Sequence, residues 1–237
     1  MALFPEIYKF LSRYFRSEPA MRLKDILRPV KHALVGKQRI YKVIEVIGEL
    51  ERRKEQKVLT IFDVGAAIGE AALPMAKGFA NARIYCFEPL PDSFERLKNR
   101  TQNFSDRIDY FNFGLYNKNG RINFYVFPHR DASSAIAQQS EGVSQTSIPV
   151  RRLDDVVEEL EIKKIDFMKV DVEGAEKEVL EGGLKTLQNC VDNVFVEISP
   201  LRKGKHSHDY IDVFEYLHKS GFSFAGVYED FFFTKLL

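Results

Sequence analysis

The sequence predicts an α/β fold in which a mostly parallel sheet is covered by helices on both faces. From residue 58 onwards, apolar segments of strand length alternate with amphipathic segments of helix length, the order expected of such a sheet. The 237 residues are 45% hydrophobic and 29% charged, which is typical of a globular chain and excludes wholesale disorder. We therefore expect one α/β domain at 58–237, preceded by a helical cap at 1–57.

The hydrophobic pattern predicts the elements in chain order. Short apolar runs mark strands at 58–62, 82–87, 109–114, 165–170 and 193–198. Amphipathic helices are expected at 71–80, 91–100, 154–161 and 175–187. The Asn119-Gly120 turn signal predicts a hairpin arm at 119–127, before a Ser/Gln-rich loop or lid at 131–147 and a strand at 147–153. A helix at 210–221 and strands at 222–228 and 231–236 follow.

Residues 1–57 contain no convincing strand and are strongly basic. They hold 14 Lys and Arg against 7 Asp and Glu, or +7, whereas the remainder holds 21 against 27, or −6. Their apolar residues recur at steps of three and four, as on one stripe of a helix: Phe4, Ile7, Tyr8, Leu11, Tyr14 and Phe15. We expect a structural cap that also closes the ligand pocket. The alternative is peripheral docking on an anionic membrane surface.

The cysteine pattern indicates a reducing compartment. Cys86 and Cys190 are the two cysteines of the chain, and Cys86 lies in the apolar run IYCF, where a buried free thiol is the ordinary expectation. The apolar stretches fall short of the roughly 18 residues that a bilayer span needs. We therefore expect a cytoplasmic protein, with contact at the inner membrane face as an additional role of the basic segment.

The first candidate ligand site is the turn after the first strand, Asp63-Val64-Gly65-Ala66-Ala67-Ile68-Gly69-Glu70. In an open doubly wound sheet, ligands bind at the carboxyl ends of strands, near the point where strand order reverses. Gly65 permits a tight turn and close ligand approach, and Gly69 permits close packing of a helix. The helix that follows offers unpaired amide donors. The alternative is a turn with a purely structural role.

An acidic residue follows the second strand, at Glu88-Pro89. Glu88 lies 23 residues after Gly65, close to the roughly 20-residue spacing at which a carboxylate binds a nucleoside ribose. The two features together favour an adenosine-containing cofactor, either NAD or S-adenosylmethionine. Ala67 occupies the position where a pyrophosphate requires glycine, which favours S-adenosylmethionine. Asp63 and the turn amides suit the amino-acid end of that cofactor.

The third strand ends at Asn112-Phe113-Gly114. Asn112 or a neighbouring backbone group is a candidate hydrogen-bond partner for adenine, and Phe113 is a candidate to pack on its face. The alternative makes Phe113 a core residue and Asn112 a turn former. Both interpretations stay open at this point.

Two carboxylates follow the buried run IDFM. Asp171 and Glu173, spaced i and i+2, converge on one rim, and Gly174 eases the turn into the next helix. Glu176 is interpreted as a charge complement to the dipole of that helix.

These segments together resemble the FkbM family of S-adenosylmethionine-dependent methyltransferases. The segments that carry the resemblance, in family order, are FDVGAAIGE (62–70), YCFEPLPDSFERLKNR (85–100), FNFGLYNKNG (111–120), RRLDDV (151–156), IDFMKVDVEGAEKEVLEGG (165–183) and VFVEIS (194–199). An alternating sheet that closes with two C-terminal strands is likewise similar to the class I methyltransferase arrangement. That similarity implies a Rossmann-like, mostly parallel seven-stranded sheet with a C-terminal antiparallel hairpin.

The resemblance also implies an activity and a set of roles. The matching positions are Asp63, Gly65 and Gly69 for the cofactor loop, Glu88 for the ribose, and Asp171 and Glu173 for the rim above the methyl group. The family often has Asn where this chain has Ala67. Its typical activity is O-methylation of a hydroxyl on a sugar or another natural product. We therefore expect an O-methyltransferase that uses S-adenosylmethionine and acts on a saccharide or other small acceptor.

Methyl transfer to an aliphatic hydroxyl needs a base, because the hydroxyl is a poor nucleophile until its proton is removed. The candidate bases are Asp171, Glu173, Glu197, and His206 or His208 in the loop KGKHSHDY. The carboxylates are favoured because they lie at strand ends. We expect no metal ion, although the three carboxylates form a possible all-oxygen Mg²⁺ site.

Two other functions are compatible with parts of the sequence. The basic segment at 1–57 with its aromatic residues is compatible with a nucleic-acid methyltransferase. The acidic remainder argues against it, and the strand end Glu197-Ile198-Ser199-Pro200 lacks the N-P-P-Y/F tetrapeptide of many amino-methylating enzymes. A non-catalytic cofactor-binding protein is the third hypothesis. Acidic residues at all the ligand-facing strand ends argue against that hypothesis.

Overall fold

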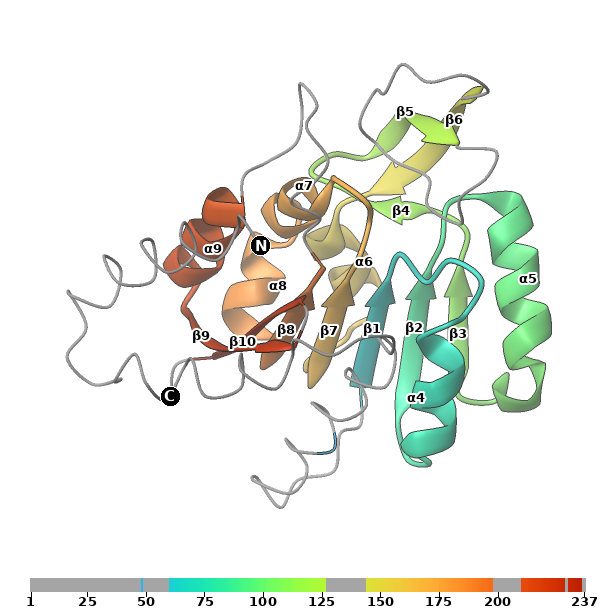
Figure 1. The fold of residues 1–237 in the computed structure, drawn as a ribbon, viewed down its shortest axis with the longest axis horizontal. Helices are drawn as coiled ribbons and strands as arrows, with labels where there is room; N and C mark the ends of the chain where they lie inside the picture. The colour runs from blue at the N-terminus through green and yellow to red at the C-terminus, as the bar shows by residue number, and fades with distance from the viewer. Residues whose placement is uncertain (1–47, 49–59, 127–143, 198–209, 229, 236–237) are drawn as a thin grey trace.

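The computed structural model describes Gly48 and residues 60–126, 144–197, 210–228 and 230–235 (Figure 1). They form a large α/β layer structure with a smaller sheet beside it. The cap expected at 1–57 lies outside the described residues, apart from Gly48. Within the described ranges, none of the helices combines the length and hydrophobicity that a membrane span requires.

The large sheet has the strand order β3-β2-β1-β7-β8-β10-β9. The first five strands in this order (β3, β2, β1, β7 and β8) run parallel. Strand β10 pairs antiparallel with both β8 and β9. The expectation of a mostly parallel α/β sheet is therefore confirmed. Its strands are β1 (Thr60–Val64), β2 (Arg83–Phe87), β3 (Ile108–Phe111), β7 (Phe167–Val170), β8 (Asn193–Val196), β9 (Phe222–Tyr228) and β10 (Asp230–Lys235).

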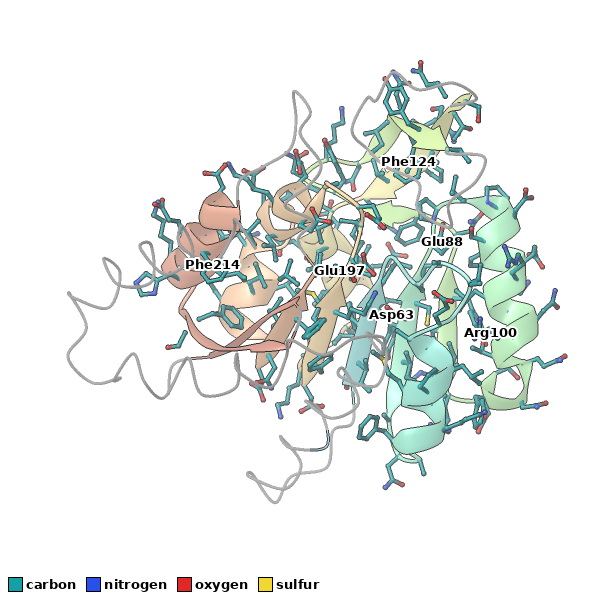
Figure 2. The ribbon with its side chains drawn as sticks, in the orientation of Figure 1. Asp63, Glu88, Arg100, Phe124, Glu197 and Phe214 are labelled. Atoms are coloured by element: carbon teal, nitrogen blue, oxygen red, sulfur yellow. The ribbon has the colours of Figure 1, made fainter. Side chains whose placement is uncertain are left out.

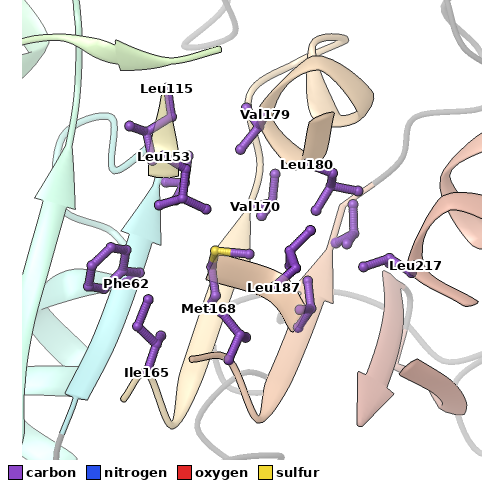
Figure 3. Close-up of a cluster of buried hydrophobic side chains, with 14 of the residues drawn as sticks. Phe62, Leu115, Leu153, Ile165, Met168, Val170, Val179, Leu180, Leu187 and Leu217 are labelled. Carbon is purple, nitrogen blue, oxygen red and sulfur yellow. The ribbon is translucent and has the colours of Figure 1, made fainter. Parts of the chain in front are cut away.

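Helices cover both faces of this sheet because its central strands carry apolar side chains on both sides. On one face, Phe62, Met168 and Val170 pack in a cluster with side chains of α6, α7, α8 and α9 (Figure 3). On the other face, Ile61 and Ile84 pack in a cluster with side chains of α4 and α5. The helices are α4 (Ala72–Gly78), α5 (Pro91–Thr101), α6 (Leu153–Glu159), α7 (Glu176–Glu181), α8 (Leu184–Asn189) and α9 (Tyr210–Lys219).

A second sheet has the order β4-β6-β5 and lies beyond the carboxyl ends of the parallel strands (Figure 1). It consists of β4 (Gly114–Leu115), β5 (Gly120–Val126) and β6 (Ser144–Arg151). Phe124, Ile148 and Val150 form its apolar face, which packs with Leu90 and Tyr116. The small sheet is thereby anchored next to the loop that follows β2.

Three expected boundaries are wrong. The first strand continues to Val64 because the ladder pairs Asp63 with Lys169 and Val64 with Val170. The third strand ends at Phe111, and Gly114 begins β4 of the small sheet. The expected loop at 131–147 is a strand at its end, because residues 144–147 pair with β5. Their exposed polar side chains gave no strand signal, and residues 127–143 lie outside the described part of the chain.

The single helix expected at 175–187 is two short helices separated by Gly182 and Gly183. A methyl group at Gly182 would overlap the backbone carbonyl oxygen of Tyr116. A methyl group at Gly183 would press on the Leu153 side chain, with 2.5 Å to its Cδ2. The two glycines therefore allow the α7–α8 corner to pack closely against α6 and the segment after β4.

We expect the Gly182→Ala substitution to lower the free energy of unfolding by about 2 kcal/mol or more, because the new methyl group would overlap a backbone carbonyl rather than a flexible side chain. Gly114→Ala is the matched control, since its methyl group would meet Val150 and Pro89 at 3.5 Å and beyond. The control should lose less than about 1 kcal/mol. Urea denaturation of both variants measures the difference, and equal losses would contradict this account of the helix break.

Candidate functional site

The candidate site lies at the carboxyl ends of β1, β2, β7 and β8, where the strand order reverses between β1 and β7. Figure 2 shows Asp63, Glu88 and Glu197 on this side of the sheet. Asp63 is the fourth residue of β1, while Glu88 and Glu197 directly follow β2 and β8. The alternation of strands and helices therefore brings these acidic residues from separate parts of the sequence to one edge.

The turn after β1 is held in place by its neighbours. The amides of Gly65 and Ala66 donate to the carbonyl of Phe87 at 3.1 and 3.0 Å. Gly65 has a φ of 82°, and a Cβ there would overlap the carbonyl oxygen of Asp171. Its missing side chain thus makes room for the loop after β7, a reason that the sequence did not reveal. Gly69 gives close packing as expected, but against Leu97 of α5.

Ala67 adopts a left-handed backbone with a φ of 47°, which is unusual for a residue with a side chain. Its amide donates to Oε2 of Glu88 at 3.0 Å. A pyrophosphate at this turn would meet a carboxylate in place of a free amide. The contact therefore adds to the sequence argument against NAD.

Glu88 is 6% exposed, and both oxygens of its carboxylate are fixed by backbone amides. Oε1 accepts from Leu90 at 2.9 Å, and Oε2 accepts from Ala67. Burial raises the pKa of Glu88 from 4.5 to about 7, although the two amides act in the opposite direction. Each oxygen retains a second lone pair, so the carboxylate can also accept from the hydroxyls of a ribose.

Asn112 and Phe113 lie beside Glu88. The Asn112 side-chain amide donates to the carbonyl of Glu88 at 2.9 Å and so fixes its backbone. Phe113 packs at tilted angles on Phe87 and Phe111, with ring centroids 5.9 and 5.6 Å apart, and the Arg151 guanidinium lies 5.4 Å from its ring centroid. Their contacts with adenine stay a prediction. Pro89 borders Gly114, which is the first residue of the small sheet.

Asp63 is fully buried, and neither of its carboxylate oxygens has a hydrogen-bond partner within the described residues. Burial raises its pKa above the ordinary value, while the ammonium of Lys169, 3.5 Å from Oδ1, acts in the opposite direction. A buried carboxylate needs donors or a positive charge around it. The Lys169 ammonium supplies that charge within the protein, and contact with the ammonium group of S-adenosylmethionine stays a prediction.

Lys169 is the residue that the sequence analysis missed. It lies in β7 and is 7% exposed, and its ammonium is 3.0 Å from Oδ2 of Asp171. Burial alone lowers the pKa of this lysine, but the charges of Asp171 and Asp63 outweigh that effect and raise it. The sequence did contain a signal for this residue, because a single cation lies in the apolar strand FMKV, two residues before a carboxylate.

The remaining predicted residues lie around the loop after β7. The amide of Asp171 donates to the carbonyl of Val64 at 3.0 Å, and the amide of Glu197 donates to the carbonyl of Val170 at 2.9 Å. Asp171 therefore lies beside the end of β1, and Glu197 lies beside the end of β7. Glu173 has a left-handed φ of 59°, and such backbones are frequent at functional sites. His206 and His208 lie outside the described residues.

Glu176 begins α7, as its interpretation as a helix-dipole complement requires. Its Oε1 also accepts from the amide of Gly174 at 2.9 Å, which closes the loop. The side chain is 7% exposed, and burial raises its pKa from 4.5 to about 7. This burial was not expected from the sequence.

Within the described residues, which include Asp171, Glu173 and Glu197, no three His, Cys, Asp or Glu side chains are arranged to hold a metal ion. The ammonium of Lys169 already contacts Asp171 and attracts Glu197. A positive charge of the protein itself thus lies among these carboxylates.

The comparisons with known proteins agree with this geometry. Residues 63–224 match the family described as the methyltransferase FkbM domain. The chain belongs to the FkbM family of S-adenosylmethionine-dependent methyltransferases. The match begins at Asp63 in β1 and includes all the candidate residues described above, as far as Glu197. The family resemblance seen in the sequence is confirmed.

Relatives of this FkbM chain include two methyltransferases named for their reactions. The hexuronic acid methyltransferase AglP of Haloferax volcanii is 33% identical over 170 residues, which cover 68% of this chain and 66% of AglP. The 2-O-methyltransferase NoeI of Sinorhizobium fredii is 28% identical over 192 residues, which cover 75% of this chain and 77% of NoeI. The chain thus spans slightly under two thirds of AglP.

Among the solved structures that align with this chain is the magnesium protoporphyrin IX methyltransferase ChlM of Synechocystis PCC 6803 with bound S-adenosylmethionine. It is 12% identical, with a TM-score of 0.47, and 96% of each chain is covered.

We expect the affinity for S-adenosylmethionine to increase about tenfold between pH 6 and pH 8. A ribose hydroxyl donates to the ionised form of Glu88, whose pKa of about 7 in the free protein means that binding must first release its proton. Isothermal titration calorimetry at several pH values measures the effect. Glu88→Gln should bind more weakly and lose most of this pH dependence, and a flat profile for the unmodified protein would contradict the role of Glu88.

We expect the Glu176→Gln variant to gain stability over the unmodified protein as pH rises from 5 to 8. A folded-state pKa raised from 4.5 to about 7 gives stability that is present at low pH and is lost as pH rises through 7. The relative gain should reach about 2–3 kcal/mol. Urea unfolding at both pH values measures it. Glu95→Gln on the exposed side of α5 is the control and should show no comparable pH-dependent difference.

Proposed function

We propose that this chain transfers the methyl group of S-adenosylmethionine to a hydroxyl of a saccharide or another small natural-product acceptor. The observation that carries the proposal is the contact between the backbone carbonyl of Asp171 and Gly65, which brings a residue with a partly exposed carboxylate next to the turn after β1. The names of AglP and NoeI, a hexuronic acid methyltransferase and a 2-O-methyltransferase, support the acceptor class.

The cofactor supplies a methyl group on a positively charged sulfur, and the protein must align it with an oxygen and remove a proton. Glu88 binds the ribose hydroxyls, and Asp63 binds the ammonium group. Asn112 and Phe113 border the adenine. These contacts hold the cofactor against the turn after β1, in the site that the loop after β7 also borders.

Asp171 acts as the general base in this proposal. Its carboxylate accepts the proton of the acceptor hydroxyl while the oxygen–carbon bond forms and the carbon–sulfur bond breaks. Glu173, Glu197 and His206 are the further candidates for contact with the acceptor. Displacement of this kind requires exclusion of water, a role that we propose for the helical cap at 1–57.

We further propose a cytoplasmic location, with peripheral contact between the basic segment at 1–57 and an anionic membrane surface. The net charge of +7 in this segment supports the contact. A lipid-linked saccharide would place the acceptor at such a surface.

We expect Asp171→Asn to reduce kcat at least about 100-fold, because the amide cannot accept the hydroxyl proton. The dissociation constant for S-adenosylmethionine should change less than about threefold. The control is Asp106→Asn, an exposed residue before the amino end of β3. Transfer of radiolabelled methyl groups and calorimetry measure the two quantities. Unchanged turnover in Asp171→Asn would remove Asp171 from the role of base.

The same assay identifies the methylated atom. Hexuronic acids and neutral sugars are offered with radiolabelled cofactor, and the product is treated with mild alkali. A methyl ether on a hydroxyl survives this treatment, whereas a methyl ester on a carboxylate is cleaved. Label released by alkali from every product would overturn the proposed hydroxyl acceptor.

A further inference from the structure

Lys169 places a buried ammonium group on a mostly apolar face of the large sheet. The β1–β7 ladder pairs it with Asp63, and it points to the same side as Ile61, Phe167 and Phe195, which pack together on that face. The residue is 7% exposed. A buried lysine is tolerated when opposite charges surround it, so its partners indicate its role.

Three carboxylates from three neighbouring strands surround this ammonium. Asp171 Oδ2 lies at 3.0 Å and Asp63 Oδ1 at 3.5 Å, and Glu197 adds a further attraction. Asp63 is fully buried, whereas the side chain of Asp171 is 24% exposed. The ammonium therefore bridges the inner carboxylate beneath the cofactor turn and the outer carboxylate at the rim.

Lys169 is not itself suited to be the base. The surrounding carboxylates raise its pKa above the ordinary value, although burial alone would lower it, so the side chain stays protonated at neutral pH. A protonated lysine has no free lone pair with which to accept a proton. Its contribution has to be electrostatic and geometric.

The backbone of Asp171 is already fixed, because its amide donates to Val64 and its carbonyl packs against Gly65. The remaining freedom is rotation of the side chain, and the bond from Lys169 to Oδ2 removes it. We propose that Lys169 is a positioning residue that occupies one oxygen of Asp171 and so presents the other to the acceptor hydroxyl. The inference rests on the proposed function, because it assumes that Asp171 is the base.

The direct test compares Lys169→Met, which keeps an unbranched side chain of nearly the same length without the charge, with Lys169→Arg, which keeps the charge. We expect Lys169→Met to lower kcat at least about 30-fold, with less than about fivefold change in the dissociation constant for S-adenosylmethionine. Lys169→Arg should recover a large part of kcat. Lys169→Met with unchanged kcat, or equal losses in both variants, would overturn the positioning role.

The chain offers a matched control at the other end of the same strand. Lys164 lies 2.6 Å from Asp166, again two residues away, and 3.2 Å from Asp192. This pair has the same spacing but lies at the amino end of β7, away from the cofactor turn. Lys164→Met should therefore leave kcat unchanged. A comparable loss in this control would show that removal of a strand-end lysine acts through general destabilisation and would overturn the proposal.

Removal of Lys169 leaves Asp63 buried without its counterion, so the single variant is open to poor folding. The double variant Asp63→Asn/Lys169→Met removes both charges and avoids that problem. Its kcat should stay at least about 30-fold below that of Asp63→Asn alone. If the double variant matches Asp63→Asn in kcat, Lys169 does not act on the base.

A second measurement separates this inference from the proposed function. A thermodynamic cycle that needs no acceptor is formed by the melting temperatures of Lys169→Met, Asp171→Asn and the combined variant Lys169→Met/Asp171→Asn. The melting temperature of this combined variant should fall by less than the sum of the two single decreases, because either single change breaks the same ion pair. Additive losses would overturn the inference even if methyl transfer is found. Conversely, if calorimetry shows no S-adenosylmethionine binding by the unmodified protein, the proposed function fails while the coupling is still measured.

Discussion

The close contact between the turn after β1 and the loop after β7 is the constraint on which the site depends. The two strands are neighbours in the sheet, but loops with side chains at the contact point would be forced apart. Gly65 removes that obstacle, because the space of its missing Cβ holds the carbonyl oxygen of Asp171. A ligand that binds to the first turn therefore meets the residues of the second loop.

Buried charge is the second feature of the site, and it opposes stability. Four ionisable side chains are under 10% exposed, and burial perturbs the pKa of each: Asp63, Glu88, Lys169 and Glu176. Apolar side chains of similar size would serve a purely structural role as well or better, since the desolvation of buried ions often exceeds their mutual attraction. Clustered, perturbed ionisable groups are typical of functional sites. Their concentration at the point where strand order reverses is best explained by binding and catalysis.

The small sheet and the α7–α8 corner show how the rest of the fold supports this edge. Leu90 directly follows the Glu88-Pro89 loop and packs in the apolar cluster of the small sheet. Tyr116 belongs to the same cluster, and its carbonyl faces the Gly182 corner. The backbone around Glu88 is thus tied to the small sheet, which in turn packs against the helices behind β7. Rigid support of this kind keeps a binding constellation in place.

Much of the fold and part of the site were predictable from the sequence, because the relevant signals are local. Apolar periodicity located the parallel strands, and the glycine turn followed by Glu88 at its spacing predicted the site that we propose for the cofactor. The errors arose where pairing or packing overrode local pattern. Residues 144–147 are polar yet form a strand, because β5 supplies their hydrogen bonds. The helix at 175–187 breaks where two glycines meet another part of the chain.

By itself, the sequence determined the alternation of strands and helices, the family and the acidic residues at the strand ends. Each of these depends on residues that are close together in the sequence. Only the tertiary structure decided that Lys169 joins Asp63 to Asp171, that Ala67 donates to Glu88 and that Gly65 makes room for another loop. The reason is physical. An ion pair or a steric contact depends on distances between atoms that the chain brings together only when the sheet has formed.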